Sequence, residues 1–265
     1  MVDEFAGQEY WAIILGGSKG LGLATAHKLA QHGMNLCLVH RTRQVDLPEA
    51  ERAFAQLEKQ GITLKHYNLD ATNAEKRQYI LMELRKQLGE TGRVRALVHS
   101  IAKGNLKPII AGVQPGLQHD DFALTIDAMA ISLYDWTKAI LQASLFATDA
   151  RIISFTSEGS QKAWRNYAAV SAAKAALEAI SRSMALELAP FGIRTNCIMA
   201  GVTDTDSLRM IPGSDELLKL SQQRNPFARL TTPEDVASVA YLLCRDEAAW
   251  INGAVIPVNG GEHLQ

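Results

Sequence analysis

A tyrosine and a lysine stand on what reads as one face of an alanine-rich helix, Tyr167 and Lys174 in NYAAVSAAK. At about 100° per residue, the seven steps between them return to within roughly 20° of the starting direction. A nearby ammonium favours phenolate and lowers the pKa of a tyrosine, so the two groups would form a proton-donating pair. A packed ring and a solvated amine would show the same spacing, so the elements around the pair decide its meaning.

A glycine-rich loop near the N-terminus offers a phosphate site. The apolar run Trp11–Leu15 leads into GGSKGLG, after which apolar residues recur at helical spacing. Gly16, Gly20 and Gly22 therefore stand where a strand turns into a helix, and there backbone N–H groups and the positive helix end approach a pyrophosphate. The alternative is a glycine-rich turn that binds no ligand. Alternation of strands and helices along the chain favours the phosphate site over this alternative.

Such alternation runs along the whole chain. The expected strands are Trp11–Leu15, Asn35–His40, Thr63–Asn68, Ala96–His99, Arg151–Thr156, Arg194–Met199 and Ala254–Val258. The expected helices begin near Leu21, Pro48, Asn73, Phe122, Asn166 and Pro233. The pattern predicts right-handed crossovers and one Rossmann-type α/β domain over residues 1–265, built on a doubly wound parallel sheet.

One long segment without an expected strand, about residues 201–232, follows the sixth strand and contains Pro212, Gly213 and Pro226. Ligands bind at the carboxyl edge of such sheets, so we expect this segment to be a substrate lid. Its apolar residues would line an acyl pocket or anchor the lid: Leu208, Met210, Ile211, Leu217, Leu218 and Leu220. Its basic residues would suit an acidic carrier protein or form a solvated face: Arg209, Lys219, Arg224 and Arg229.

Composition sets the broad class. The 265 residues are 47% hydrophobic and 21% charged, with net charge −1, which suits one large core and gives no strong attraction to nucleic acid or anionic membranes. The start, MVDEFAGQEYWAII, lacks a basic region, and no run has the length of a membrane span, so we expect a cytoplasmic protein. Cys37, Cys197 and Cys244 lie in apolar surroundings and predict buried thiols. No residue spacing suggests a metal site.

Together the motifs resemble the short-chain dehydrogenase/reductases over essentially the whole chain. The matching segments are LGGSKGLG, Asp70 in NLDAT, VHSIA at 98–102, FTSEGS at 155–160, the Tyr167 and Lys174 pair, MAGVTDT at 199–205 and NGGEHL. Most of that superfamily has three residues between the catalytic Tyr and Lys, but here the position four before Lys174 is Val170. The wide gap and VHSIA resemble the enoyl-acyl-carrier-protein reductases. The stretch from NYAAV to GIRTN, with DTDSLRMIPG, is most similar to their divergent, NADPH-using branch.

Two positions depart from those reductases, and a third departs only from the wider superfamily. Ser157 stands where the better-known branch has a second tyrosine, and it matches the catalytic serine of the wider superfamily. Leu15 stands where a threonine usually opens the glycine motif, and Asp127 matches an aspartate of the enoyl reductases where the usual catalytic tetrad has an asparagine. The site therefore mixes features of two groups.

The resemblance implies the catalytic residues Tyr167, Lys174 and Ser157. Tyr167 would donate to the thioester oxygen, on which negative charge appears as hydride reaches the β-carbon. Lys174 would bond the nicotinamide ribose and stabilise charge on the phenol. Ser157 would contact the same oxygen, position the ring, or merely bond nearby backbone.

The resemblance also implies a cofactor site. Its residues are Gly16, Ser18, Lys19, Gly20, Leu21, Gly22, Arg41, Arg43, Asp70, Ser100, Ile101, Ala102, Lys174, Gly201, Val202 and Thr205. Because HRTR follows the second strand with no acid before Asp46, Arg41, Arg43 and Lys19 predict NADPH. Asp70 would contact adenine or cap a helix. Val202 and Thr205 would meet the carboxamide and phosphate or only support the lid, while His99 is expected to be packed.

Three functions stay open. The first is NADPH-dependent reduction of the 2,3 double bond of an enoyl thioester, on acyl carrier protein or CoA, in fatty-acid or polyketide synthesis. The second, favoured by Ser157, is reduction of a 3-oxoacyl thioester or another carbonyl. The third, dinucleotide binding without catalysis, is disfavoured by the presence of both Tyr167 and Lys174. The alanine-rich helix and the apolar INGAVIPVNGG predict a homo-oligomer, which the resemblance makes a tetramer.

Overall fold

Seven parallel strands form the centre of the molecule. The computed structural model describes residues 4–110, 112, 115–211 and 213–265. The strands are β1 (Tyr10–Leu15), β2 (Asn35–His40), β3 (Leu64–Asn68), β4 (Arg93–His99), β5 (Phe146–Ser157), β6 (Ile193–Ala200) and β7 (Val255–Val258). They lie in the order β3-β2-β1-β4-β5-β6-β7. The predicted Rossmann-type fold is confirmed, with every expected strand present.

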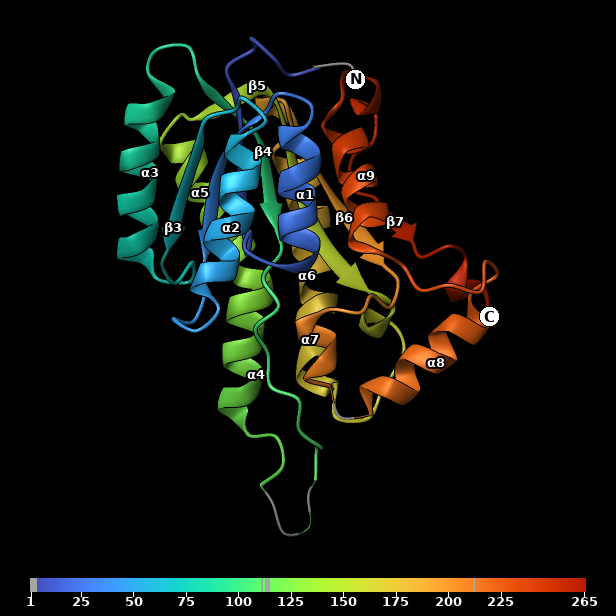
Figure 1. The fold of residues 1–265 in the computed structure, drawn as a ribbon. Helices are drawn as coiled ribbons and strands as arrows, with labels where there is room; N and C mark the ends of the chain where they lie inside the picture. The colour runs from blue at the N-terminus through green and yellow to red at the C-terminus, as the bar shows by residue number, and fades with distance from the viewer. Residues whose placement is uncertain (1–3, 111, 113–114, 212) are drawn as a thin grey trace.

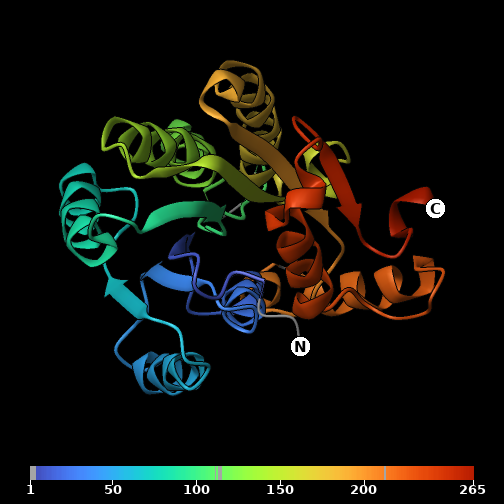
Figure 2. The same ribbon diagram turned by 90° about the horizontal axis from the view of Figure 1, so that it is seen from above.

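Helices cover both faces of the sheet (Figures 1 and 2). One face carries α1 (Gly20–Ala30), α2 (Leu47–Glu58) and α9 (Pro233–Cys244), and the other carries α3 (Ala74–Leu88), α5 (Ser132–Gln142) and α6 (Ala168–Glu187). Successive strand residues point to opposite faces, so Ile14 joins one apolar core and Ile13 the other. Burial on both faces explains why the strands read as nearly continuous apolar runs.

The carboxyl ends of the strands meet at the lower edge of the sheet in Figure 1. There lie α4 (His119–Ile126), α7 (Asp206–Arg209) and α8 (Ser214–Arg224). The expected lid contains α7 and α8, and its described residues contain no strand. Pro212 lies outside the described residues, and Gly213, at φ 82°, precedes α8. The winding reverses between β1 and β4, which is where a sheet of this kind opens a crevice for a ligand.

Two helices differ from the sequence expectation. The helix expected from Phe122 begins earlier, at His119, and a π-helical turn over Asp127–Ile131 separates α4 from α5. One extra residue in a helical turn leaves the apolar pattern almost unchanged, so periodicity could not reveal it. The helix expected from Asn166 starts at Ala168, because Asn166 has a left-handed backbone, at φ 63°.

Further expectations concern the cysteines and the membrane. Cys37, Cys197 and Cys244 are free and buried, as predicted. Across the described part of the chain, every helix is too short or too polar to cross a membrane.

Candidate active site

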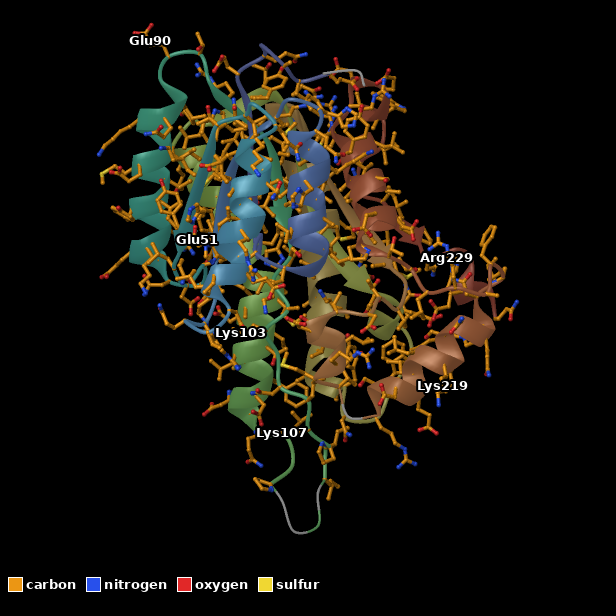
Figure 3. The ribbon with its side chains drawn as sticks, viewed as in Figure 1. Glu51, Glu90, Lys103, Lys107, Lys219 and Arg229 are labelled. Atoms are coloured by element: carbon orange, nitrogen blue, oxygen red, sulfur yellow. The ribbon has the colours of Figure 1, made fainter. Side chains whose placement is uncertain are left out.

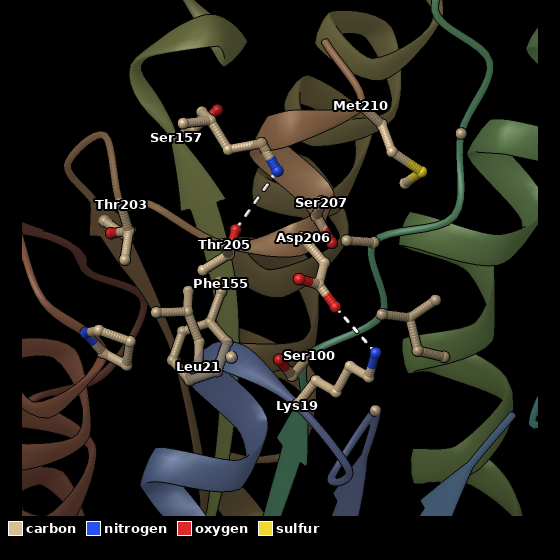
Figure 4. A pocket seen from close by; sticks show the side chains of 18 of the residues that line it. Lys19, Leu21, Ser100, Phe155, Ser157, Thr203, Thr205, Asp206, Ser207 and Met210 are labelled. Carbon is tan, nitrogen blue, oxygen red and sulfur yellow. Dashed lines mark hydrogen bonds and ion pairs between the residues drawn. The ribbon is translucent and has the colours of Figure 1, made fainter. Parts of the chain in front are cut away.

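A cavity of about 570 Å³ opens at the carboxyl edge of the sheet, between the glycine loop, the ends of β4, β5 and β6, and the lid (Figure 4). Many predicted site residues line it: Gly16, Ser18, Lys19, Gly20, Leu21, Ser100, Ile101, Ala102, Ser157, Tyr167, Lys174, Gly201 and Thr205. Gly22, Arg41, Arg43, Asp70 and Val202 lie outside its wall. The structure thus brings residues from five separate segments to one site.

The glycine loop is built for close approach of a ligand backbone. Gly16 has φ 83°, and a Cβ atom there would overlap the carbonyl oxygen of Ser100. A Cβ atom at Gly22 would overlap the carbonyl oxygen of Gly16, so Gly22 allows α1 to start directly behind the loop. Lys19, the residue before α1, makes no side-chain capping bond, so the first N–H groups of the helix are left for another acceptor. This cradle fits the pyrophosphate of a dinucleotide.

Lys174 and Tyr167 reach the cavity from the start of α6. The Lys174 ammonium is buried and donates a hydrogen bond of 2.6 Å to the carbonyl oxygen of Phe155. Burial lowers the pKa of Lys174 to about 8. Burial also raises the pKa of Tyr167, so the lowering expected from the lysine is not found in this arrangement. The ammonium is directed to the strand carbonyl, not to the phenol.

Ser157 ends β5 beside Tyr167. Its hydroxyl is buried and makes no well-aligned hydrogen bond to any described residue, so the expected alternative of a bond to nearby backbone is not found. It lies close enough to Tyr167 to oppose in part the rise in the phenol pKa caused by burial. A Cβ atom at Gly159 would meet the ring of Tyr167 and approach Ser157 Oγ, which shows how tightly the two groups sit together.

The wall around Tyr167 is apolar. Met129, Val170 and Ala173 pack with the tyrosine in a small buried cluster, with Ile211 of the lid against it. The lid also contributes Leu208 and Met210 to the cavity wall, so these two apolar residues line the cavity, and their role in an acyl pocket stays a prediction. The other three apolar lid residues lie outside the wall: Leu217, Leu218 and Leu220. Met129 comes from the π-helical turn, and no sequence pattern indicated that it lies in the site.

Charged groups gather at the glycine-loop end of the cavity, where Lys19 and Asp206 line the wall, and just outside it. Lys19 Nζ is 2.8 Å from Asp206 and 3.4 Å from Asp46. Arg41 is 3.1 Å from Asp70, whose other oxygen accepts bonds from the backbone N–H and the hydroxyl of Thr72. Asp70 therefore stabilises the turn before α3, and Asn73 caps the helix itself.

Two further facts concern these charges. Although burial favours the neutral acid, the bonds from Thr72, with Lys103 and Arg41, hold the pKa of Asp70 at about 2. Asp206, from α7, was not among the residues predicted from the sequence.

Comparison with known proteins fits this geometry. A family model described as Enoyl-(Acyl carrier protein) reductase matches residues 16–263. The chain belongs to this family. An NADH-dependent enoyl-[acyl-carrier-protein] reductase of Aquifex aeolicus is 32% identical over 185 residues, 69% of this chain and 68% of that protein. A 3-oxoacyl-[acyl-carrier-protein] reductase of Chlamydia muridarum is 26% identical over 252 residues, 94% of this chain and 96% of that protein.

A solved structure of an Aquifex aeolicus enoyl-[acyl-carrier-protein] reductase (NADH) superposes with a TM-score of 0.82 at 26% identity, covering 98% of both chains. The chain is therefore an oxidoreductase of the short-chain dehydrogenase/reductase superfamily, in a family that binds nicotinamide dinucleotides.

In this reductase, an ion-pair cluster joins the lid to the end of β5. Arg224 of α8 lies 3.0 Å from both carboxylate oxygens of Glu158, the residue after Ser157. Lys162 binds the same carboxylate at 2.5 Å, and Arg224 also donates to the carbonyl oxygen of Glu262 near the C-terminus. The α8 helix is thereby tethered beside Ser157.

Most of the basic lid residues of the reductase are paired. Arg209 binds Asp204 and Asp215, and Arg229 binds Asp235. Lys219 is exposed on α8 and points away from the body (Figure 3). Pairing with neighbouring carboxylates leaves this surface less basic than its sequence suggests.

His99 has the structural role expected for it. Its Nε2 lies 2.8 Å from Ser132 Oγ, and the ring is buried at the end of β4. Burial lowers its pKa to about 3, so the imidazole is neutral at pH 7. Asp127 is exposed at the start of the π-helical turn, outside the cavity wall. Within the described residues, no group of three or more His, Cys, Asp or Glu could hold a metal ion.

Proposed function

We propose that the protein reduces the 2,3 double bond of an enoyl thioester with NADPH, in fatty-acid or polyketide synthesis. The observation that carries the proposal is the buried Tyr167, set against an apolar wall and beside Lys174, at the far end of a cavity that begins at a phosphate-type glycine loop. The wall suits an acyl chain, and the loop suits a dinucleotide.

When bound, the dinucleotide supplies a hydride to the β-carbon of the substrate. Tyr167 donates a hydrogen bond to the thioester oxygen, where negative charge develops. Because burial raises its pKa, the phenol keeps its proton at neutral pH and serves as donor. Lys174 adds positive charge near that oxygen and holds the ribose, and Ile211 with Met129 keeps water from the apolar side.

NADPH is proposed over NADH because of Arg41, Arg43 and Lys19. Arg41 and Arg43 follow β2, where an acid would bind the ribose 2′-hydroxyl, and both are exposed, although Arg41 is paired with Asp70. The relative from Aquifex aeolicus carries NADH in its name, so the preference is a property proposed for this chain. For the other cofactor-binding residues, we propose the contacts that the sequence analysis assigned to them. Asp70 would help to form the adenine side of the site by stabilising the turn before α3.

A second function, reduction of a 3-oxoacyl thioester, is favoured by one observation. The Ser157 hydroxyl lies beside Tyr167 and makes no aligned bond within the described residues, so it can hold a substrate carbonyl. The 3-oxoacyl reductase among the relatives also supports ketone reduction as the second candidate function. Binding without catalysis is disfavoured, since Tyr167 and Lys174 both line the cavity.

The test is a direct assay of the purified protein with NADPH and NADH against crotonyl and acetoacetyl thioesters, each on CoA and on acyl carrier protein. We expect crotonyl reduction with NADPH to be fastest. Efficient acetoacetyl reduction with no crotonyl turnover would establish the second function instead. The homotetramer and the cytoplasmic location stay predictions, and light scattering that reports a 29.0 kDa particle would refute the first of these.

A further inference from the structure

Lys19, the cation of the glycine loop, is shared by two carboxylates. Asp206 of α7 lies 2.8 Å from Lys19 Nζ, and Asp46, just before α2, lies 3.4 Å from it. Figure 4 shows the lysine and Asp206 facing each other across the cavity. The hydrogen bond that Lys19 donates to Asp206 raises the pKa of Lys19, so the ammonium is fully charged at neutral pH and already bound to an anion.

The neighbouring cations are paired in the same way. Arg41 lies 3.1 Å from Asp70, and Lys103 lies 3.7 Å from the same carboxylate. Carboxylates thus nearly balance the cations at this end of the cavity. Of these carboxylates, Asp206 alone belongs to the lid, which makes it the one whose position changes if the lid moves.

We infer that Asp206 sets the affinity of this site for a 2′-phosphate, because its carboxylate holds the lysine that the phosphate must bind. The inference rests on the NADPH preference proposed above and deepens it. It makes Asp206 a residue that determines cofactor specificity, and it couples occupancy of the phosphate site to the position of α7.

The Asp206 carboxylate and the 2′-phosphate compete for the ammonium of Lys19. Side-chain exposure is 39% for Lys19 and 75% for Asp206, so solvent screens the pair and separating it costs little. The carboxylate nevertheless stays near the incoming phosphate and repels it. Removing that charge while keeping the shape of the side chain should therefore tighten binding of a 2′-phosphate and leave the rest of the nucleotide unaffected.

The chain offers a matched control. Asp204 also lines the cavity and belongs to the same segment, but it binds Arg209 with both oxygens, at 2.6 Å each, instead of Lys19. Asp204→Asn changes the same net charge nearby without freeing the lysine.

The experiment measures binding by calorimetry, without turnover. Adenosine 2′,5′-bisphosphate and AMP differ only in the 2′-phosphate. We expect Asp206→Asn to bind the bisphosphate about three- to tenfold more tightly than the wild type at low salt, with AMP affinity unchanged. The gain should shrink at about 300 mM salt, since screening weakens the repulsion. It should also be smaller when Lys19→Met is added, because the carboxylate and the phosphate then no longer compete for the lysine and only their repulsion remains. Asp204→Asn should bind both nucleotides like the wild type.

Three results would overturn the inference: equal gains for both nucleotides, the same gain in Asp204→Asn, or no change in Asp206→Asn. The proposed NADPH preference has its own contradicting outcome, which differs from the three results above. A wild type that binds the bisphosphate no better than AMP contradicts the NADPH preference, and if Asp206→Asn then creates that preference, the role of Asp206 is supported. A wild-type preference that Asp206→Asn leaves unchanged contradicts the role of Asp206 alone.

Discussion

The two edges of the sheet bury polar groups in opposite ways. At the amino edge, three arginines on adjacent strands meet at one carboxylate: Arg95 of β4, Arg151 of β5 and Arg194 of β6 all bind Asp149. Arg95 and Arg151 are each only 1% exposed. Their remaining N–H groups donate to backbone carbonyls in and just after α9 and to Asp246. The nitrogen atoms of both buried guanidinium groups therefore all donate to described acceptors.

At the carboxyl edge, buried polar groups are only partly paired by hydrogen bonds within the described residues. Among the described residues, Lys174 donates one hydrogen bond, to the Phe155 carbonyl, although an ammonium has three donors. Ser157 Oγ finds no aligned partner in the part of the chain that the structure describes. Incomplete pairing in a buried site costs stability and leaves donors for a ligand. The comparison teaches that the amino edge maintains the fold while the carboxyl edge is arranged for chemistry.

The largest effect should come from Asp149→Ala at the amino edge. It leaves two buried guanidinium groups without their shared carboxylate, and we expect the free energy of unfolding to fall by about 3–5 kcal/mol. Urea denaturation measures this, while kcat of the folded protein should stay within about threefold of wild type. Asp246→Ala is the control, since that carboxylate is 90% exposed and should matter far less. Equal losses in both variants, or a lost kcat, would contradict the division between the edges.

At the carboxyl edge, Tyr167→Phe should act on rate and not on stability. Loss of one donor to the developing oxyanion should lower kcat on a 2-enoyl thioester by about 10²-fold or more, with nucleotide binding retained. Ser157→Ala should be milder for enoyl reduction, whereas for ketone reduction the two losses should be comparable. Steady-state kinetics on both thioesters, with fluorescence titration of NADPH, distinguishes these cases. A Tyr167→Phe variant with near-normal kcat would refute the assignment of the donor.

The smallest expected effect is on the free energy of unfolding of a Lys174→Met variant, and it depends on pH. Lys174→Met should slow the reaction and weaken NADPH binding, yet raise the free energy of unfolding at pH 7 by about 1–2 kcal/mol, because a buried charge is removed. Burial lowers the pKa of Lys174 from the ordinary 10.5 of a lysine to about 8 in the folded protein. Between these values the unfolded chain binds more protons, so this cost is full below pH 8 and is relieved as pH rises toward 10.5.

Unfolding measured at pH 7 and pH 9.5 checks this sign. The free energy of unfolding of Lys174→Met should exceed that of the wild type by less at the higher pH. The difference should decrease as Lys174 loses its proton in the folded wild-type protein. A methionine variant that is less stable than wild type at pH 7 would place Lys174 with the compensated charges of the amino edge.

Much of the fold followed from the sequence, for local reasons. Strands such as Asn35–His40 are buried on both faces, so their residue types alone identified them with the correct bounds. The glycine loop was predictable because Gly16 and Gly22 are required by backbone approach. The π-helical turn and the left-handed Asn166 were not, since one extra residue in a turn or one inverted φ leaves little trace in apolar periodicity.

For the site, residue types and their spacing led to Tyr167, Lys174 and the glycine loop, and the family resemblance added Ser157. What each of these residues bonds became clear only from the packing of the folded chain. It directed Lys174 to the Phe155 carbonyl, brought Met129 to the tyrosine, and paired Lys19 with Asp206 across 187 positions of the chain. The reason is physical: spacing fixes the direction of side chains within one element, whereas pairing and burial depend on how separate elements pack.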